Sequence, residues 1–132
     1  MQSKGLASSR PLKSGTDDLI EHVINGIREK KGHDIVSIDL RSINSSLADL
    51  FVVCHGDSDV HVKAIAQSVV DEVEKHTGES PVYKEGFSNA EWILLDYINV
   101  VVHVFRKEQR DYYGIEEFWA DAETRHIKDN IS

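Results

Sequence analysis

The sequence contains one cysteine and seven histidines, the side chains from which nucleophilic or metal chemistry would be built. A thiolate beside an imidazole base can act as a nucleophile. Cys54 and His55, however, lie in a predicted strand, where consecutive side chains point to opposite faces. A free cysteine is also a common core residue. We therefore interpret Cys54 as a buried strand residue and predict that the protein is not an enzyme.

The histidines lack the spacing that is typical of a metal site. None forms a close His-x-His pair, and no cysteine completes a zinc-like pattern. His55 and His61 flank a predicted helix start and are the one pair that could converge. His103 lies among valines, which favours a hydrogen-bonded histidine in the core or at its rim. We predict neither a metal nor a cofactor.

Gly56-Asp57-Ser58 precedes a predicted helix, whose first N–H groups could hold a phosphate. A P-loop would need further glycines and a Lys-Ser/Thr pair, which this segment lacks. Asp57 and Asp59 have the spacing of a magnesium-binding pair, but they would repel an anion, and no third acid has a clear position. A capped helix start is the favoured interpretation. A nucleotidyltransferase-like nucleotide site is the alternative.

Hydrophobic periodicity predicts the helices that would position these groups. The first begins at Thr16 as its N-cap and ends near Gly32. The second begins after Asp57 or Ser58 and ends at Gly78. The apolar stripe of the second helix is the most regular pattern in the sequence, and it consists of Val62, Ile65, Ala66, Val69, Val70 and Val73. A last helix is expected from about Lys107.

Apolar runs predict about five strands. They are 34–40, 51–54, an edge strand at 81–84, and the two arms of a hairpin within 92–105. Asp96–Asn99 would form the hairpin turn. The segment from Phe51 to Lys84 could be a right-handed crossover between parallel strands. The order indicates an α+β fold with two layers, in which helices pack on a mixed sheet of about five strands.

Composition limits the class of protein further. The 132 residues predict a flexible leader at 1–15, one domain at 16–122 and a frayed polar tail at 123–132. No apolar run is long enough to span a bilayer, and a lone cysteine fits a reducing compartment, so we expect a cytoplasmic protein. The formal net charge of −8 argues against direct, sequence-specific nucleic-acid binding. It favours a basic protein partner.

Aromatic residues are concentrated in the last third of the chain, next to acids. Tyr112 and Tyr113 are consecutive and cannot share one helix face, so at least one of them should be exposed. Exposed aromatic side chains beside carboxylates are typical of a protein-docking surface. The aromatic residues concerned are Trp92, Tyr97, Tyr112, Tyr113, Phe118 and Trp119.

Three stretches together resemble the ribosome silencing factor (Iojap) family over roughly residues 17–122. They are Leu47-Ala48-Asp49-Leu50-Phe51-Val52-Val53-Cys54-His55-Gly56-Asp57-Ser58 with the following helix that contains Val62-Lys63-Ala64-Ile65-Ala66, then Glu91-Trp92-Ile93-Leu94-Leu95-Asp96 with Val101-Val102-His103-Val104-Phe105, and Arg110-Asp111-Tyr112-Tyr113-Gly114-Ile115-Glu116-Glu117-Phe118-Trp119. The chain departs from the family at Ile98-Asn99, where a Gly-Asp turn is usual, and at His61, where Gln is common.

The resemblance implies a nucleotidyltransferase-like αβ domain that is used for binding and is often a homodimer when free. It implies a translation repressor that binds the large ribosomal subunit through ribosomal protein L-fourteen at the intersubunit face and sterically blocks joining of the small subunit. We place the expected contacts on the hairpin and the last helix. The predicted partner-binding residues are Asp96, Tyr97, Asn99, His103, Arg110, Tyr112, Tyr113 and Trp119.

Overall fold

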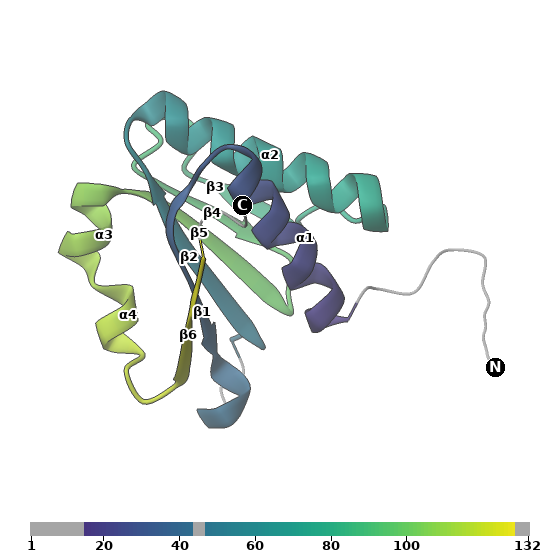
Figure 1. Ribbon diagram of the computed structural model, residues 1–132, viewed down its shortest axis with the longest axis vertical. Helices are drawn as coiled ribbons and strands as arrows, with labels where there is room; N and C mark the ends of the chain where they lie inside the picture. Colours follow the sequence, from purple (N-terminus) through teal and green to yellow (C-terminus); the bar gives the residue numbers. More distant parts are fainter. Residues whose placement is uncertain (1–14, 44–46, 129–132) are drawn as a thin grey trace.

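A computed structural model describes residues 15–43 and 47–128 (Figure 1). The leader expected at 1–15 therefore lies almost wholly outside the described residues. The elements in chain order are α1 (Thr16–Glu29), β1 (His33–Asp39), the short 3-10 helix η1 (Leu40–Ile43), β2 (Leu50–Gly56), α2 (Asp59–Thr77), β3 (Tyr83–Glu85), β4 (Trp92–Asp96), β5 (Val100–Arg106), α3 (Lys107–Tyr113), α4 (Ile115–Phe118) and β6 (Glu123–Ile127).

The sheet has six strands in the order β3-β4-β5-β2-β1-β6. The β2–β5 pair at its centre is parallel, and the other neighbouring pairs are antiparallel. The α+β class, the mixed sheet and the β4–β5 hairpin are confirmed. The strand count is higher than predicted because Glu123–Ile127, expected to be a frayed tail, pairs with β1. The polar side chains of β6 are tolerated because this strand lies at an edge and is mostly exposed.

The parallel pairing differs from the predicted crossover. The strand that follows α2 is β3, and it lies at the far edge of the sheet beside β4. The parallel partner of β2 is β5, which the chain reaches only after the hairpin turn. The expected edge position of the strand near Pro81 is confirmed, and this strand is only three residues long.

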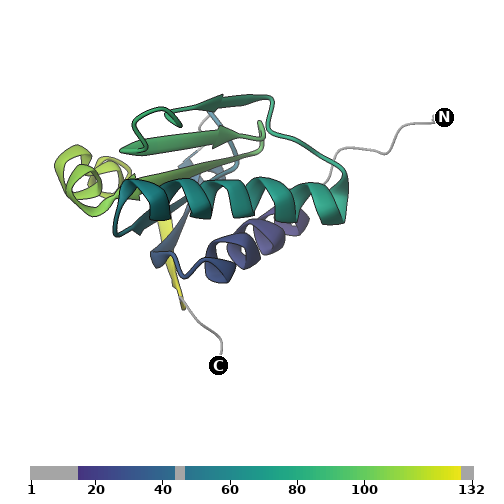
Figure 2. The same cartoon turned by 90° about the horizontal axis from the view of Figure 1, so that it is seen from above.

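Helices α1 and α2 cover one face of the sheet, while α3 and α4 lie on the opposite side at one end (Figures 1 and 2). Each face has its own buried cluster. The predicted stripe of α2 faces the sheet, with every member buried except Val70, which is half-buried. Valine is a weak helix former, so packing on the sheet is what stabilises this helix.

The helix ends follow the predicted chemistry in part. Ser58 caps α2 by accepting a hydrogen bond from the backbone N–H of His61, and Gly78 ends α2 in the left-handed conformation. Thr16 is not the N-cap of α1, because Gly15 occupies that position. The Thr16 hydroxyl instead donates to Asp49 at 2.6 Å, and thus ties α1 to the segment before β2.

The last helix is broken, contrary to the single helix predicted from Lys107. Gly114 adopts a left-handed conformation with φ 56°, which ends α3 after Tyr113 and redirects the chain into α4. Glycine adopts this conformation without the steric cost that a Cβ would add. The break lets α4 turn back along the sheet, so that Ile115 and Trp119 pack on the cluster of the open face.

Candidate functional site

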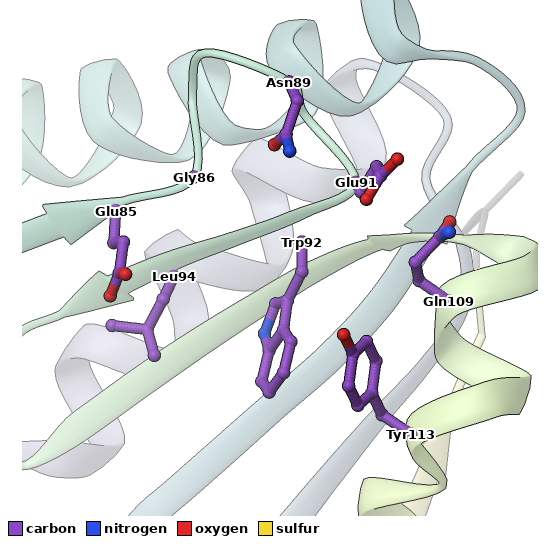
Figure 3. Close-up of a pocket in the computed structure, with 8 residues that line it drawn as sticks. All are labelled: Glu85, Gly86, Asn89, Glu91, Trp92, Leu94, Gln109 and Tyr113. Atoms are coloured by element: carbon purple, nitrogen blue, oxygen red, sulfur yellow. The ribbon is translucent and has the colours of Figure 1, made fainter.

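The face opposite α1 and α2 is only partly covered, and a hollow of about 310 Å³ lies on it between β4 and α3. Figure 3 shows the rings of Trp92 of β4 and Tyr113 of α3 side by side at this hollow. Glutamates border it on the β3–β4 side. The residues lining it are Glu85, Gly86, Asn89, Glu91, Trp92, Leu94, Gln109 and Tyr113.

Strand alternation decides which side chains reach this face. Ile93 and Leu95 are buried toward the helices, whereas Trp92, Leu94 and Asp96 are half-buried on the other side. Across the hairpin, Trp92 pairs with Phe105 and Leu94 with His103. Residues two apart in a strand share a face, so Trp92, Leu94 and Asp96 form one row.

Trp92 is held from two sides. Its indole ring stacks on Phe105 at 4.8 Å between ring centroids and contacts Tyr113 at 4.8 Å. Its Nε1–H donates to His103 Nδ1 at 3.1 Å. A fixed aromatic ring loses little conformational entropy when a partner packs on it, which is typical of a binding hot spot. Trp92 was missing from the predicted contacts, although its parity with Asp96 in β4 could have identified it.

His103 is a buried supporting residue and offers no surface to a partner. It is 3% exposed, and burial lowers its pKa to about 4 because the imidazolium form loses solvation. The ring is therefore neutral at pH 7. Since the indole N–H can only donate, Nδ1 is the acceptor, and the ring proton is on Nε2. The prediction of a hydrogen-bonded histidine in the core or at its rim is thus confirmed. Its burial means that His103 cannot itself contact a partner, although it was also among the predicted partner-binding residues.

Arg110 is also buried, contrary to its predicted place on the surface. Its guanidinium donates to Glu116 at 2.8 and 3.2 Å and to His55 Nδ1 at 2.9 Å. Burial and the neighbouring Arg110 charge both lower the pKa of His55. Arg110 thus links α3 and α4 to the sheet through hydrogen bonds. It can affect docking only indirectly, by holding these helices in place.

Tyr97 is the third predicted contact that the structure places inside. It is 2% exposed and belongs to the cluster beneath α1 and α2, and burial raises the pKa of its hydroxyl. Its parity in the strand matches that of Ile93 and Leu95, which is the reason it faces the helices. A partner cannot reach its ring in this conformation.

Asp96 and Asn99 build the hairpin turn. Asp96 Oδ1 accepts from the Ile98 N–H at 2.7 Å, and Ile98 has a φ of 77°. The Asn99 carbonyl accepts from the N–H groups of Asp49 and Leu50 at 2.9 and 3.1 Å. This turn lies about 13 Å from Trp92 along β4. The structure therefore separates the turn from α3, which the sequence had grouped in one face.

The remaining predicted contacts lie on α3 and just after α4. Tyr112 is 82% exposed and Tyr113 53% exposed, which confirms that at least one of this pair is at the surface. Trp119 is half-buried and meets Phe51 edge-on at 6.0 Å between centroids. Phe118, which was not among the predicted contacts, is 77% exposed.

Polar groups at the hollow complement the aromatic floor. Within residues 15–43 and 47–128, neither Glu85 nor Glu91 forms a salt bridge, and Glu85 accepts a hydrogen bond from the Tyr83 hydroxyl at 3.0 Å. Gln109 also lines the hollow, and its buried side-chain oxygen has no hydrogen-bond partner in the described part of the chain. Carboxylates around aromatic rings suit the ammonium or guanidinium group of a basic protein.

The groups of the alternative nucleotide site have other partners. Asp57 lies 3.1 Å from His33 Nε2, and Arg106 donates to Asp59 at 3.0 Å. The Ser58 hydroxyl caps α2. A Cβ at Gly56 would come within 3.0 Å of the His61 ring. These contacts belong to a capped helix start, as predicted, and they leave Asp57 hydrogen-bonded to His33 and Asp59 ion-paired with Arg106.

Comparisons with known proteins agree with this reading. The family model described as "Ribosomal silencing factor during starvation" matches residues 13–132. Curated relatives include the ribosomal silencing factor of Halalkalibacterium halodurans, 37% identical over 87% of this chain and 97% of that protein. The same factor of Bacillus subtilis is 44% identical over 71% of this chain and 78% of that protein.

A solved structure from Chromobacterium violaceum has the same fold, with a TM-score of 0.76 at 37% identity over 81% of this chain and 88% of the other. No helix in the described part of the chain is long and apolar enough to cross a membrane. The family match, the relatives and the shared fold lead to one conclusion. The chain belongs to the ribosomal silencing factor (RsfS) family, whose members regulate translation and are not enzymes.

Proposed function

We propose that this protein represses translation by binding the large ribosomal subunit through ribosomal protein L-fourteen at the intersubunit face. The bound domain would sterically block joining of the small subunit. The observation that carries the proposal is the open aromatic and acidic hollow, which we call the docking face. We define it by Glu85, Glu91, Trp92, Leu94, Gln109 and Tyr113.

The chemistry of the docking face supports a basic protein as its partner. Trp92 and Tyr113 supply apolar area that a partner can bury, and Glu85 and Glu91 are placed to meet Lys or Arg side chains at its border. Bare RNA would be repelled by these carboxylates and by the net charge of −8. We therefore assign the contact to a ribosomal protein.

Co-sedimentation with purified large subunits, followed by addition of small subunits, tests the proposal. We expect the protein to travel with large subunits and to reduce the peak of joined ribosomes. Binding without any reduction of that peak would contradict the steric block. Failure to sediment with large subunits at moderate salt would contradict ribosome binding itself.

Two substitutions locate the contact. Glu91→Lys reverses a charge at the hollow and Tyr113→Ala removes an exposed ring, and each should raise the dissociation constant about tenfold or more. Glu21→Lys is the matched control, because it makes the same charge change at an exposed position of α1, on the other face. Circular dichroism checks that each variant is folded. Normal binding by both docking-face variants would place the contact elsewhere.

Asp96→Arg shows how far the contact extends along β4. Asp96 shares the row of Trp92 and Leu94 but lies at the turn. We propose that Asp96 and Asn99 contact the partner only at the margin, so Asp96→Arg should weaken binding less than Glu91→Lys does. An effect as large as that of Glu91→Lys would extend the docking face to the turn.

We further infer that the free protein is a homodimer and that it acts in the cytoplasm. The described sheet ends in two exposed edge strands, β3 and β6, each of which offers unpaired backbone groups that a second copy could pair with. Light scattering across a range of concentrations tests the dimer, and a mass that stays monomeric would contradict it.

The cytoplasmic location is supported by the cysteine. The lone cysteine is buried in β2 and forms no disulfide, which fits a reducing compartment.

A further inference from the structure

Three side chains of metal-binding type meet between α1 and α2, away from the docking face. His22 of α1 stacks on His76 of α2 with 4.5 Å between ring centroids and 3° between ring planes. Glu72 Oε2 lies 3.0 Å from His76 Nε2. One imidazole nitrogen from each histidine and one Glu72 oxygen all lie within 4.8 Å of one another. For these three atoms to bind a single ion, the imidazole rings would rotate out of their stacked arrangement, since a metal lies in the plane of the ring that binds it.

The fold holds this arrangement in place. Glu72 and His76 are four residues apart, so they lie on one face of α2. The two helices approach closely at Gly26, where a Cβ would come within 2.7 Å of the Val69 backbone. The Ser68 hydroxyl donates to the Gly26 carbonyl at 2.8 Å and fixes the same contact. His22 and His76 are thus brought together by backbone packing as well as by their own contact.

We propose that His22, Glu72 and His76 form a binding site for a divalent transition metal, with Zn²⁺ as the fitting ion. Two imidazole nitrogens and one carboxylate are a ligand set that Zn²⁺ accepts, with a fourth position left for water. Mg²⁺ and Ca²⁺ prefer sites made of oxygen atoms. The site lies in the last turns of α2, where the partial negative charge of the helix end favours a cation.

Two further observations support the site. His22 Nδ1 is buried and has no hydrogen-bond partner within residues 15–43 and 47–128, and a metal bound through this nitrogen would satisfy it. Asp18, one helical turn before His22, lies 3.7 Å from His22 Nε2. It adds a second negative charge beside the ligands, and it could orient the imidazole through its other nitrogen, as carboxylates commonly do at metal sites.

A second histidine cluster, made of His33, Asp57 and His61, is less suited to metal. Both His61 nitrogens already have partners, because Nδ1 accepts from the Asp57 N–H at 2.9 Å and Nε2 pairs with the Lys30 carbonyl at 2.7 Å. A metal there would have to break a contact that closes the start of α2. This cluster therefore serves as the internal control.

The expected consequence of the metal is a link between α1 and α2. An ion that binds the folded chain alone raises stability in proportion to the logarithm of its concentration over Kd. Because α1 and α2 cover the face opposite the docking face, the link should leave ribosome binding unchanged. The metal site and the proposed function can thus fail independently.

The test uses the full chain without a polyhistidine tag, stripped with a chelator and titrated with ZnCl₂ by calorimetry. We expect one ion per chain and a rise in melting temperature on adding Zn²⁺, with no such rise for MgCl₂. Co²⁺ should give visible absorption bands of a four-coordinate site. His22→Gln, Glu72→Gln and His76→Gln should each weaken binding more than about tenfold, since the loss of a direct ligand costs at least as much as the loss of a residue that supports one.

His33→Gln is the matched control and should bind Zn²⁺ as the unchanged chain does. The His76→Gln variant changes a half-exposed side chain at the end of α2, so it should remain folded. No measurable Zn²⁺ binding by the unchanged chain would overturn the proposal. So would binding that survives both His22→Gln and His76→Gln, or that is lost with His33→Gln.

Discussion

At the scale of single residues, a neutral histidine supports the aromatic floor of the docking face. His103 accepts the Trp92 indole hydrogen bond through Nδ1 and lies beside Phe51 and Phe105. Its folded-state pKa of about 4 lies below the value of 6.5 expected for an exposed imidazole. The unfolded chain therefore binds a proton at His103 between these two pH values, while the folded chain does not.

This difference makes stability depend on pH. Above pH 6.5 the ionisation of His103 does not change the free energy of unfolding. As the pH falls from 6.5 to about 4, the free energy of unfolding decreases, by about 3 kcal/mol in total. His103→Asn keeps an acceptor near the Trp92 N–H but does not titrate there. We expect urea denaturation of the variant to show a shallower loss of stability in this window. An identical pH slope for both proteins would contradict the assignment.

Sequence patterns predicted which segments are strands better than they predicted which face of the sheet each side chain occupies. The burial of Cys54 followed from its strand context alone. Tyr97 was placed among the partner contacts as part of the hairpin, yet it has the same parity as Ile93 and Leu95 and lies in the core. Arg110 could not be read as buried, because its partners His33 and His55 lie far away in the sequence.

At the scale of elements, one guanidinium joins four segments. Arg110 of α3 bonds to Glu116 of α4, to the His33 carbonyl of β1 and to His55 of β2. The exposed Tyr112 and Tyr113 follow it on the same short helix. The position of these tyrosines over the sheet therefore depends on a buried polar contact at the other side of α3.

Removing this contact should loosen α3 and α4. Arg110→Met leaves Glu116 without its partner and should lower the free energy of unfolding by about 2 kcal/mol, a value reduced for the partial exposure of Glu116. Ribosome binding should weaken in parallel. Adding Glu116→Gln to the same chain should restore part of the stability, because the unpaired carboxylate is gone. Strictly additive losses in urea denaturation would show that the two residues act separately.

Three features of the fold were not predicted from the sequence, because each depends on a tertiary contact or on a single residue conformation. Strand β6 consists of Glu123, Thr124, Arg125, His126 and Ile127, whose polarity indicates no strand until β1 provides a hydrogen-bonding edge. The break at Gly114 depends on one left-handed residue. The β2–β5 pairing depends on which strands meet, and local periodicity does not contain that information.

At the scale of the whole molecule, charge should govern association. The net charge is −8, and the proposed partner is a basic protein surrounded by RNA. Salt screens both the attraction to the basic protein and the repulsion from the RNA, over a Debye length of about 10 Å at 0.1 M. Binding to the isolated ribosomal protein should thus weaken as salt rises, whereas binding to whole large subunits should change less.

Titrations in increasing NaCl, with the isolated ribosomal protein and with large subunits, measure this difference. Glu91→Lys should reduce the salt dependence with the isolated protein, because one attractive pair is lost. Glu21→Lys should leave most of it. If binding to the isolated ribosomal protein and binding to large subunits depended equally on salt, repulsion by the surrounding RNA would not contribute to the contact.

The fold class was accessible from the sequence because helix and strand periods are strong local signals. The docking face was accessible only in outline. Its aromatic and acidic residues come from β3, the turn before β4, β4 itself and α3. Their meeting is a property of the assembled sheet. The same holds for His22 and His76, which no spacing rule would pair.

The position of β6 beside β1 has a consequence for biosynthesis. β1 is among the first elements to be translated, while α3, α4 and β6 follow all the others in the described chain. In a nascent chain that has exposed only β1 to β5, the edge of β1 that β6 later covers is unpaired, and Gln109 and Tyr113 of the docking face are missing. The proposed docking face is therefore complete only after α3 has been made, so a partly made copy presents just the β3–β4 part of it.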